Sequence, residues 1–462
     1  MTKKTAAFKY IDLFAGCGGL SLGLESGGGQ LIVAVERSPM AGETFYHNLI
    51  ERMDKKADWD SYISSSIEKQ FQKGLIVREL GELLQSKTLM SKLRAASPDL
   101  VVGGPPCQGF SLAGRRNKED LRNQLPWQFL QVVEETSPKM VVIENVVGMR
   151  HKFDSDEGDV FKQLQRALEE TGKGYVVQAV EVNALHYGAP QHRPRLMIIG
   201  LRADVAKKNQ ISSTEVLWRS AFLDEIDPST IPSLAPIPTV ERAGKRTVGE
   251  AIGDLQPGMK RKFGDTGFSS DLTGLFHHLP YSGSVIPNQV ERVHTSKTQL
   301  RFSLYQMFKS LNIDARVLGI PSEKVTKEEL SKIKKAIADV KYPAKSEDGR
   351  VLAGSEAELI KVIVKLKTKK HSQRVLEWNE PARTVVTVAD DYVHPFAPRT
   401  FTVRELARFQ GFPDTFEFKA KETTGGLNRR NEVPQYSQVG NAVSPFLALA
   451  VGKLANRVLK GL

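Results

Sequence analysis

Short apolar runs alternate with amphipathic stretches between residues 8 and 201. Helical spacing of apolar residues predicts helices at residues 20–25, 40–51 and 160–170. Because strands alternate with helices, the pattern predicts an α/β fold with a doubly wound, mostly parallel sheet that carries helices on both faces. The apolar runs, bounded by turn-forming or charged residues, predict strands at residues 8–14, 31–35, 75–80, 100–102, 140–143, 175–182 and 196–201.

A glycine-rich turn at residues 15–19 follows the first predicted strand. Glycines let a ligand approach the backbone closely, and free N–H groups of the next helix can face that ligand. Glu36 ends the second predicted strand, where a carboxylate can accept both hydroxyls of a ribose. The turn lacks GxGxxG spacing, so the pattern favours a nucleoside ligand without a pyrophosphate. A tight turn beside a surface glutamate is the structural alternative.

The string GGPPCQGFS at residues 103–111 places Cys107 on a turn after the fourth predicted strand. Open α/β sheets hold their chemistry at the carboxyl ends of strands, and two prolines stiffen the backbone just before the thiol. Such a thiol is either a nucleophile or a small buried hydrophobic residue. The turn by itself leaves both interpretations open.

The 462 residues carry a net charge of +12 and include only two cysteines, Cys17 and Cys107. A basic balance favours a polyanionic partner such as nucleic acid. Two distant cysteines give neither a disulfide framework nor zinc-ligand spacing, which indicates a reducing compartment. No apolar run is long enough to span a membrane, and a first strand near Phe8 leaves no room for a signal peptide. We therefore expect a cytoplasmic protein of two or three domains.

Six sequence blocks together resemble the DNA (cytosine-5) methyltransferase family, in its bacterial restriction–modification form. They occur in the family's order: DLFAGCGGLSLGL at 12–24, GGPPCQGFS at 103–111, ENV at 144–146, QHRPR at 191–195, RTFTVRELARFQGFPD at 399–414 and QVGNAVSP at 438–445. The resemblance implies a methyltransferase fold that binds S-adenosyl-L-methionine, with an inserted, smaller target-recognition domain. It implies transfer of a methyl group to C5 of a flipped cytosine in a short, specific double-stranded DNA sequence.

The resemblance assigns four catalytic residues and no metal. Cys107 would attack cytosine C6 as a thiolate, which makes C5 able to take the methyl group. Glu144 would share a proton with N3, and Arg195 would hold O2. Arg193 would hold either Glu144 or nearby backbone. A capping or salt-bridged glutamate is the alternative for Glu144.

The cofactor residues implied by the resemblance come from three blocks and two predicted strand ends. Phe14 would lie against the adenine, Glu36 would bind the ribose, and Glu79 would meet the adenine amino group. Glu79 departs from the family's GDI string, because the glycine is absent and Glu replaces Asp. The full set is Phe14, Gly16, Gly18, Gly19, Glu36, Glu79, Pro105 and Asn441.

Residues 109–125 resemble a mobile loop that closes over the extruded base. Ser111, Arg115 and Arg116 would contact DNA, Arg115 and Arg116 through phosphates. A solvated surface loop is the alternative.

The block order predicts a catalytic and cofactor-binding domain at residues 1–202 plus 377–462, with target recognition at 203–376. Within the latter we expect helices at 322–340 and 356–366, and a basic stretch at 365–374 that lies on phosphates. After it we expect a strand region at 379–391, a helix at 401–410 and a final helix at 445–459. Thr402 and Glu405 have the spacing of a capping box.

Three other functions fit parts of the pattern. An RNA (tRNA) cytosine-5 methyltransferase shares the PPCQ and ENV strings but usually carries a Cys-Phe-Thr string, which is absent here. A non-catalytic DNA-binding relative is disfavoured by the intact Cys107, Glu144, Gln191 and Arg195. A small-molecule methyltransferase is disfavoured by the basic charge and the long insert. We expect a monomer that binds double-stranded DNA, with a cognate restriction endonuclease encoded nearby.

Overall fold

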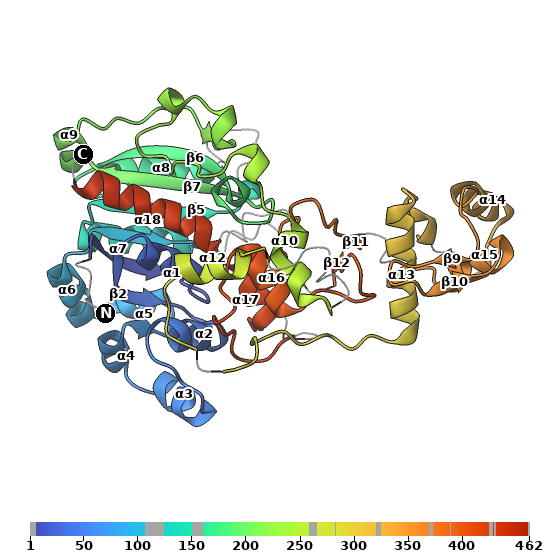
Figure 1. Cartoon of the computed structure of the whole chain (residues 1–462). Helices are drawn as coiled ribbons and strands as arrows, with labels where there is room; N and C mark the ends of the chain where they lie inside the picture. The colour runs from blue at the N-terminus through green and yellow to red at the C-terminus, as the bar shows by residue number, and fades with distance from the viewer. Residues whose placement is uncertain are drawn as a thin grey trace.

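The computed structural model describes residues 6–106, 124–149, 160–257, 266–281, 283–319, 325–368, 373–388, 390–424, 428 and 431–460. Its centre is an eight-stranded sheet with the strand order β3-β2-β1-β4-β5-β7-β6-β8 (Figure 1). The strands are β1 Phe8–Leu13, β2 Gly29–Val35, β3 Leu75–Ile76, β4 Leu100–Gly103, β5 Met140–Asn145, β6 Tyr175–Asn183, β7 Pro194–Arg202 and β8 Trp218–Arg219.

The strand order confirms a doubly wound, mostly parallel sheet. β1, β2, β3, β4 and β5 pair in parallel, and β7 runs antiparallel to both β5 and β6. The chain leaves β1 toward β2 and β3, then returns to place β4 on the other side of β1. Such a switch point opens a crevice at the carboxyl ends of the two central strands.

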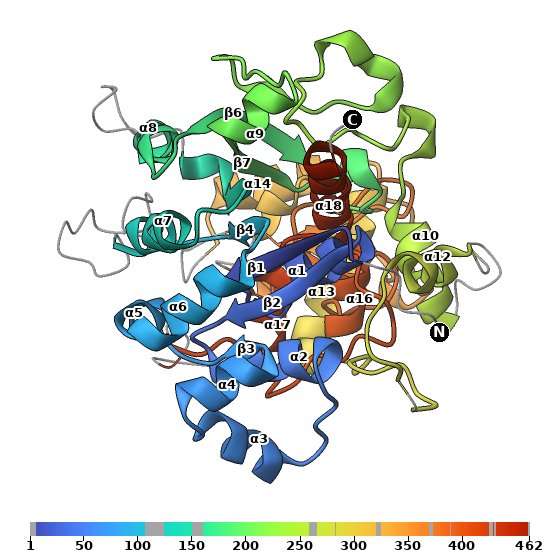
Figure 2. The ribbon, with the colours of Figure 1, turned by 90° about the vertical axis from the view of Figure 1, so that its left-hand side faces the viewer.

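Two helical layers cover the sheet (Figure 2). One face packs against α5 Leu80–Gln85, α6 Lys87–Ala96, α7 Leu125–Thr136 and α8 Val160–Glu170. The other face packs against α1 Gly19–Ser26 and α18 Pro445–Lys460, which come from opposite ends of the chain. The predicted strand at 75–80 is too long, because β3 ends at Ile76 and a helix begins at Leu80.

Glycines let α1 and α18 approach at backbone distance. A Cβ atom on Gly23 would lie 2.4 Å from both Ala448 Cβ and Pro445 O, and one on Gly27 would lie 2.8 Å from Gly452 Cα. The carboxyl-terminal helix therefore completes the layer above the glycine turn. In the described part of the chain no single helix is long and apolar enough to cross a membrane. Only α17 Gln435–Asn441 and α18, bent by 42°, meet that length and composition as a pair.

A smaller body stands apart from the sheet, on the right of Figure 1. It has its own hydrophobic core, formed by α13 Ser296–Ser310, α14 Lys327–Ala336, α15 Glu356–Lys365 and the hairpin of β9 Ala344–Lys345 with β10 Val351–Ala353. The pair β11 Arg374–Val375 and β12 Tyr392–Val393 lies between this body and the sheet.

The expected boundary at residue 202/203 does not coincide with the boundary between the two cores. Residues as far along as Phe276 belong to the core beneath α18, and the separate core begins at Phe302. Helix α10 Val248–Ile252 and helix α12 Phe268–Leu275 therefore pack with the catalytic half. The apolar residues of this stretch bury against the nearest existing core, which sequence order does not reveal.

Two other local predictions need correction. The helix expected at 322–340 spans Lys327–Ala336, because a Thr326–Glu329 capping box starts it. The strand region expected at 379–391 forms only an isolated bridge, between Gln191 and Ala382, in its described part. Pro381 has no N–H to donate, and the Gln191 side chain accepts the N–H of Val385 at 3.0 Å. The capping box at Thr402 is confirmed at the start of α16 Val403–Gln410.

Candidate active site

Three parallel strands bring the predicted site residues to one edge of the sheet. Leu13 of β1 pairs with Gly103 of β4, and Gly103 pairs with Ile143 of β5. The next residue on each strand is Phe14, Gly104 and Glu144, respectively. These three residues therefore lie side by side at the carboxyl edge, next to the switch point.

The glycine turn after β1 is tied to the end of β2. Glu36 Oε2 accepts the N–H of Gly16 at 2.9 Å, and Glu36 Oε1 accepts the N–H of Ser38 at 2.6 Å. Burial raises the pKa of the Glu36 carboxyl, and these two donors oppose the rise. Glu36 is therefore not a free surface glutamate, and its carboxylate faces the turn.

Phe14 adopts a left-handed backbone with φ of 60°, which is rare for a bulky side chain. The turn continues with φ of 57° at Gly16 and 95° at Gly18. A Cβ atom on Gly16 would meet no atom within 4 Å, so open space lies over the turn. A strained aromatic residue beside an open glycine backbone is typical of a ligand site.

The last sequence block abuts the same turn. A Cβ atom on Gly19 would lie 2.4 Å from Val443 O, so the backbone of the last block touches the start of α1. Cys17 Sγ donates to Gln438 O at 3.6 Å, and burial raises the pKa of this thiol to about 12. Asn441 is exposed at the end of α17, two residues before Val443.

Glu79 is, like Asn441, an exposed member of the predicted cofactor set. It precedes α5, and its N–H donates to Glu82 Oε1 at 3.3 Å in a capping arrangement. Its side chain is 66% exposed and lies 3.6 Å from Arg37 Nη1. The carboxylate thus stands at the carboxyl end of β3 with a solvent-exposed ion pair as its partner.

A nearly buried ion pair occupies the end of β5. Arg195 Nε lies 2.8 Å from Glu144 Oε1, and the two side chains are only 10% and 12% exposed. Burial lowers the pKa of Arg195 and the carboxylate opposes this, so the guanidinium keeps its charge. A Cβ atom on Gly104 would lie 2.8 Å from Glu144 Oε2, so a side chain at this position would displace the carboxylate.

The turn that leads to the predicted nucleophile is fixed against this pair. Asn145 Nδ2 donates to Pro105 O at 3.0 Å, and Asn145 Oδ1 accepts the N–H of Val146 at 2.9 Å. Pro105 is buried. The predicted residues Cys107, Ser111, Arg115 and Arg116 lie outside the described residues.

Arg193 contacts backbone and not Glu144. Its guanidinium donates to Val385 O at 2.9 Å, Gly440 O at 2.7 Å and Ala442 O at 2.9 Å. The side chain is 1% exposed. Of the two roles expected for Arg193, the structure shows the backbone one, since Arg195 takes the carboxylate.

Comparison with known proteins decides the family. The family model for the C-5 cytosine-specific DNA methylase matches residues 8–456. This chain belongs to that family. It is 29% identical to the Type II methyltransferase M.DdeI of Desulfomicrobium norvegicum over 96% of this chain and 87% of the relative. It is also 29% identical to the Type II methyltransferase M.AgeI of Thalassovita gelatinovora, over 96% and 98%.

A solved structure is similar in fold to this DNA methylase. The protein, assigned as a DNA modification methyltransferase encoded within a prophage (E. coli), has a TM-score of 0.52 and 21% identity over 98% of this chain and 99% of its own. The predicted family, methyltransferase fold and cytosine-5 DNA methylation are confirmed.

Sequence reasoning missed the buried Gln410 of the methylase and its contact with Gln191. Gln191 Nε2 donates to Gln410 Oε1 at 2.7 Å, and Gln410 Nε2 donates to Val439 O at 2.6 Å. Together with Arg193 they join the QHRPR block, α16 and the last block. The sequence held one indication of this contact. Gln410 is a polar residue that follows Phe409 at the end of the apolar face of a helix, where a buried side chain needs a partner.

The described ranges of this methylase do not bring together the side chains that a metal site needs. No group of three or more His, Cys, Asp or Glu side chains lies close enough there to hold an ion.

Proposed function

We propose that this methylase transfers a methyl group from S-adenosyl-L-methionine to C5 of a cytosine in a short, specific double-stranded DNA sequence, through a covalent bond between Cys107 Sγ and cytosine C6. The observation that carries this proposal is the placement of Gly104, Glu144 and Arg195 at the same sheet edge as the glycine turn. The Gly104-Pro105-Pro106 backbone runs from that edge directly into Cys107.

The residues at the switch point fit an S-adenosyl-L-methionine ligand. Phe14 offers an aromatic ring for the adenine, and the open space over Gly16 admits the methionine part. The Glu36 carboxylate already accepts two backbone N–H groups, and it is placed to accept ribose hydroxyls. Gly18, Gly19, Glu79, Pro105 and Asn441 complete the proposed binding set. When bound, this molecule supplies an electrophilic methyl group on a sulfonium.

The protein residues would activate the cytosine in four linked steps. The Cys107 thiolate bonds to C6, and the ring electrons move so that C5 becomes nucleophilic. Glu144 shares a proton with N3 of the cytosine. Arg195 holds the Glu144 carboxylate in place and stabilises the negative charge that develops at O2. After C5 has taken the methyl group, a base removes the C5 proton. The C6–S bond then breaks, and the thiolate leaves as aromaticity returns.

Target recognition belongs, in this proposal, to residues 203–376, and its independent core is the body built from α13, α14 and α15. Lysines on α14 and α15 give this body cationic groups for DNA phosphates. Ser111, Arg115 and Arg116 are proposed to contact DNA from the loop after Cys107. We propose that the protein belongs to a restriction–modification system with a cognate endonuclease, because the similar curated proteins are Type II methyltransferases. We propose further that it is a monomer and that it acts on nucleoid DNA in the cytoplasm.

Bisulfite sequencing of plasmid DNA from cells that express the protein tests the proposal. We expect protected cytosines at one short sequence, and none with the Cys107→Ala variant, because that variant cannot form the bond to C6. Cofactor affinity of the variant, measured by calorimetry, should stay near the wild-type value. Protection by Cys107→Ala would exclude the covalent route. Unprotected DNA together with methylated transfer RNA would reassign the substrate.

A further inference from the structure

Residues 283–295, here called the strap, connect the catalytic half to α13 at the start of the small body (Figure 1). Its valines point away from the protein: Val285, Val290 and Val293 are 73%, 63% and 99% exposed. Burial of these valines therefore does not hold the strap. Polar contacts do join it to the rest of the chain, among them Arg404 Nε to Pro287 O at 3.0 Å and Arg292 to Asp390 at 2.6 Å.

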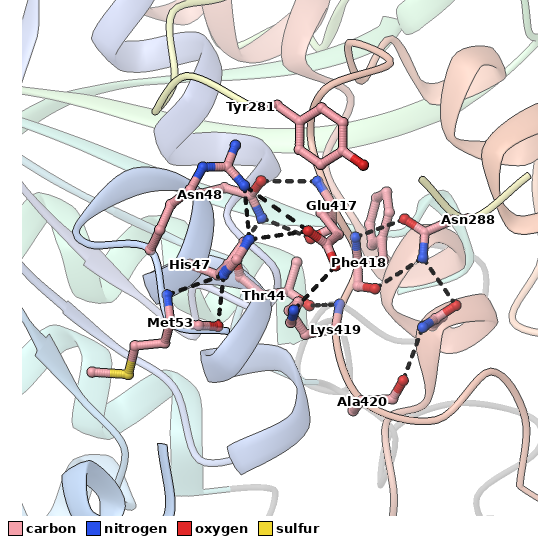
Figure 3. Close-up of polar contacts among 12 residues, drawn as sticks. Thr44, His47, Asn48, Met53, Tyr281, Asn288, Glu417, Phe418, Lys419 and Ala420 are labelled. Atoms are coloured by element: carbon pink, nitrogen blue, oxygen red, sulfur yellow. Dashed lines mark hydrogen bonds and ion pairs between the residues drawn. The ribbon is translucent and has the colours of Figure 1, made fainter. Parts of the chain in front are cut away.

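Asn288 makes the most specific of these contacts. Its Nδ2 donates to Phe418 O at 2.9 Å, and its Oδ1 accepts the N–H of Phe418 at 2.8 Å (Figure 3). Its own carbonyl accepts the N–H of Arg404 at 3.1 Å. The Asn288 side-chain amide thus makes the two backbone hydrogen bonds to residue 418 that a neighbouring β-strand would otherwise make. The Asn288 backbone has φ of 64°, a conformation that asparagine and glycine tolerate better than other residues.

Helix α2 Pro39–Leu49 holds the same segment from the other side (Figure 3). Asn48 Nδ2 donates to Glu417 O at 2.8 Å, and Asn48 Oδ1 accepts the N–H of Glu417 at 2.9 Å. The N–H of Lys419 donates to Thr44 Oγ1 at 2.8 Å. Three consecutive N–H groups, at residues 417, 418 and 419, therefore go to three different side chains, two from α2 and one from the strap.

The two ends of this arrangement lead to the two binding surfaces of the enzyme. Helix α2 begins after Ser38, whose N–H is bound by the proposed ribose carboxylate Glu36. The strap leads into α13 and the small body. Segment 417–419 contacts both α2 and the strap, so it links the cofactor layer to the chain that leads into the small body.

We infer that Asn288 is a positioning residue for DNA recognition: its amide fixes the strap, and with it the small body, relative to the cofactor layer. The inference rests on the proposed function, in which the small body binds DNA. Without this anchor the small body samples several orientations, and only some of them contact DNA while the target base reaches the active site. Apparent DNA affinity then falls in proportion to the competent fraction.

Two substitutions separate the amide from the backbone conformation. Asn288→Gly keeps access to the positive φ and removes the amide. Asn288→Asp keeps the acceptor for the Phe418 N–H but sets an oxygen against Phe418 O. Asn209→Gly is the control, because it deletes one side-chain amide hydrogen bond away from the strap, from Asn209 Nδ2 to Val458 O of α18 at 2.9 Å.

Steady-state methylation of the duplex identified by bisulfite sequencing gives the readout. For Asn288→Gly we expect the KM for DNA to rise about tenfold. This is the fold-change that corresponds to losing one to two net hydrogen bonds. Its kcat at saturating DNA, and its affinity for S-adenosylhomocysteine without DNA, should stay within about twofold of wild type, as should every constant of Asn209→Gly. Asn288→Asp should shift the KM for DNA in the same direction.

An unchanged KM for DNA in a folded Asn288→Gly protein would overturn the inference. So would a joint fall of kcat and S-adenosylhomocysteine affinity, because that result describes general loosening of the catalytic half. If Asn288→Gly does not melt cooperatively, Asn288→Asp decides by the same criteria. Failure of the wild-type enzyme to methylate the duplex would instead refute the proposed function, and it is seen before any variant is compared.

Discussion

Replacing Gly104 by alanine tests whether the position of the Glu144 carboxylate controls the reaction. A Cβ atom at Gly104 would lie 2.8 Å from Glu144 Oε2, and among the described residues the only other atom within 4 Å is Glu144 O at 3.6 Å. The φ of Gly104 lies outside the left-handed region, so alanine is compatible with the backbone. The flexible carboxylate end is therefore the group that must move.

The size of that movement follows from the contact distances. Restoring ordinary contact at 3.4 Å from 2.8 Å requires Glu144 Oε2 to shift by about 0.6 Å. The same carboxylate holds Arg195 Nε at 2.8 Å, so the ion pair is disturbed as well. Acid–base groups contribute about 10²–10⁴-fold and small misplacements cost up to about 10²-fold, so we expect kcat to fall about 10- to 100-fold. The free energy of unfolding should change by less than about 1.5 kcal/mol, because only one side chain is forced away from its preferred rotamer.

Single-turnover transfer of labelled methyl groups to duplex DNA measures the effect, with thermal melting as the test of folding. Gly148→Ala is the matched control, since no atom of the described residues lies within 4 Å of a Cβ atom built there. A folded Gly104→Ala enzyme with the wild-type single-turnover rate would refute the argument that the position of Glu144 matters.

Three further predictions address the cofactor carboxylate, the helix contact and pH. Glu36→Ala should weaken S-adenosyl-L-methionine binding about 10- to 100-fold by calorimetry, and an unchanged affinity would assign the ribose to another group. Gly23→Ala should lower the free energy of unfolding by about 1–3 kcal/mol in urea titrations, because its Cβ would lie 2.4 Å from Ala448 Cβ. Gly274→Ala, with no atom within 4 Å, should not destabilise. Burial raises the pKa of Asp12 to about 7, so the stability due to its protonated form is complete below about pH 4 and is lost as pH rises through 7. Asp12→Asn should therefore melt above wild type at pH 8 and lose this advantage at pH 4, whereas the same difference at both pH values would contradict the assignment.

Local pattern was enough to predict most of the sheet. The buried strand β4 and residues Met140–Ile143 of β5 are continuous apolar runs, and such runs arise because both faces of a central parallel strand are covered. The capping box at Thr402 and Glu405 is equally local, since both hydrogen bonds join residues three apart. Motif order then placed Glu144 and Arg195 at one site, and the structure pairs them.

Contacts between distant segments could not be predicted in this way. Nothing in the QHRPR string distinguishes Arg195, which meets Glu144, from Arg193, which binds three carbonyls of residues 385, 440 and 442. The choice depends on which parts of the chain pack against each side chain.

The amino-acid sequence by itself determined most strands of the large sheet, the helix cap at Thr402, the family and the residue types of the site, because these depend on neighbours a few positions away. Only the tertiary structure decided where the small body begins, that Gln191 meets Gln410, and that Asn288 and Asn48 share one segment as their anchor. The physical reason is that buried polar groups must find partners wherever the packed chain supplies them, and sequence distance puts no limit on that choice.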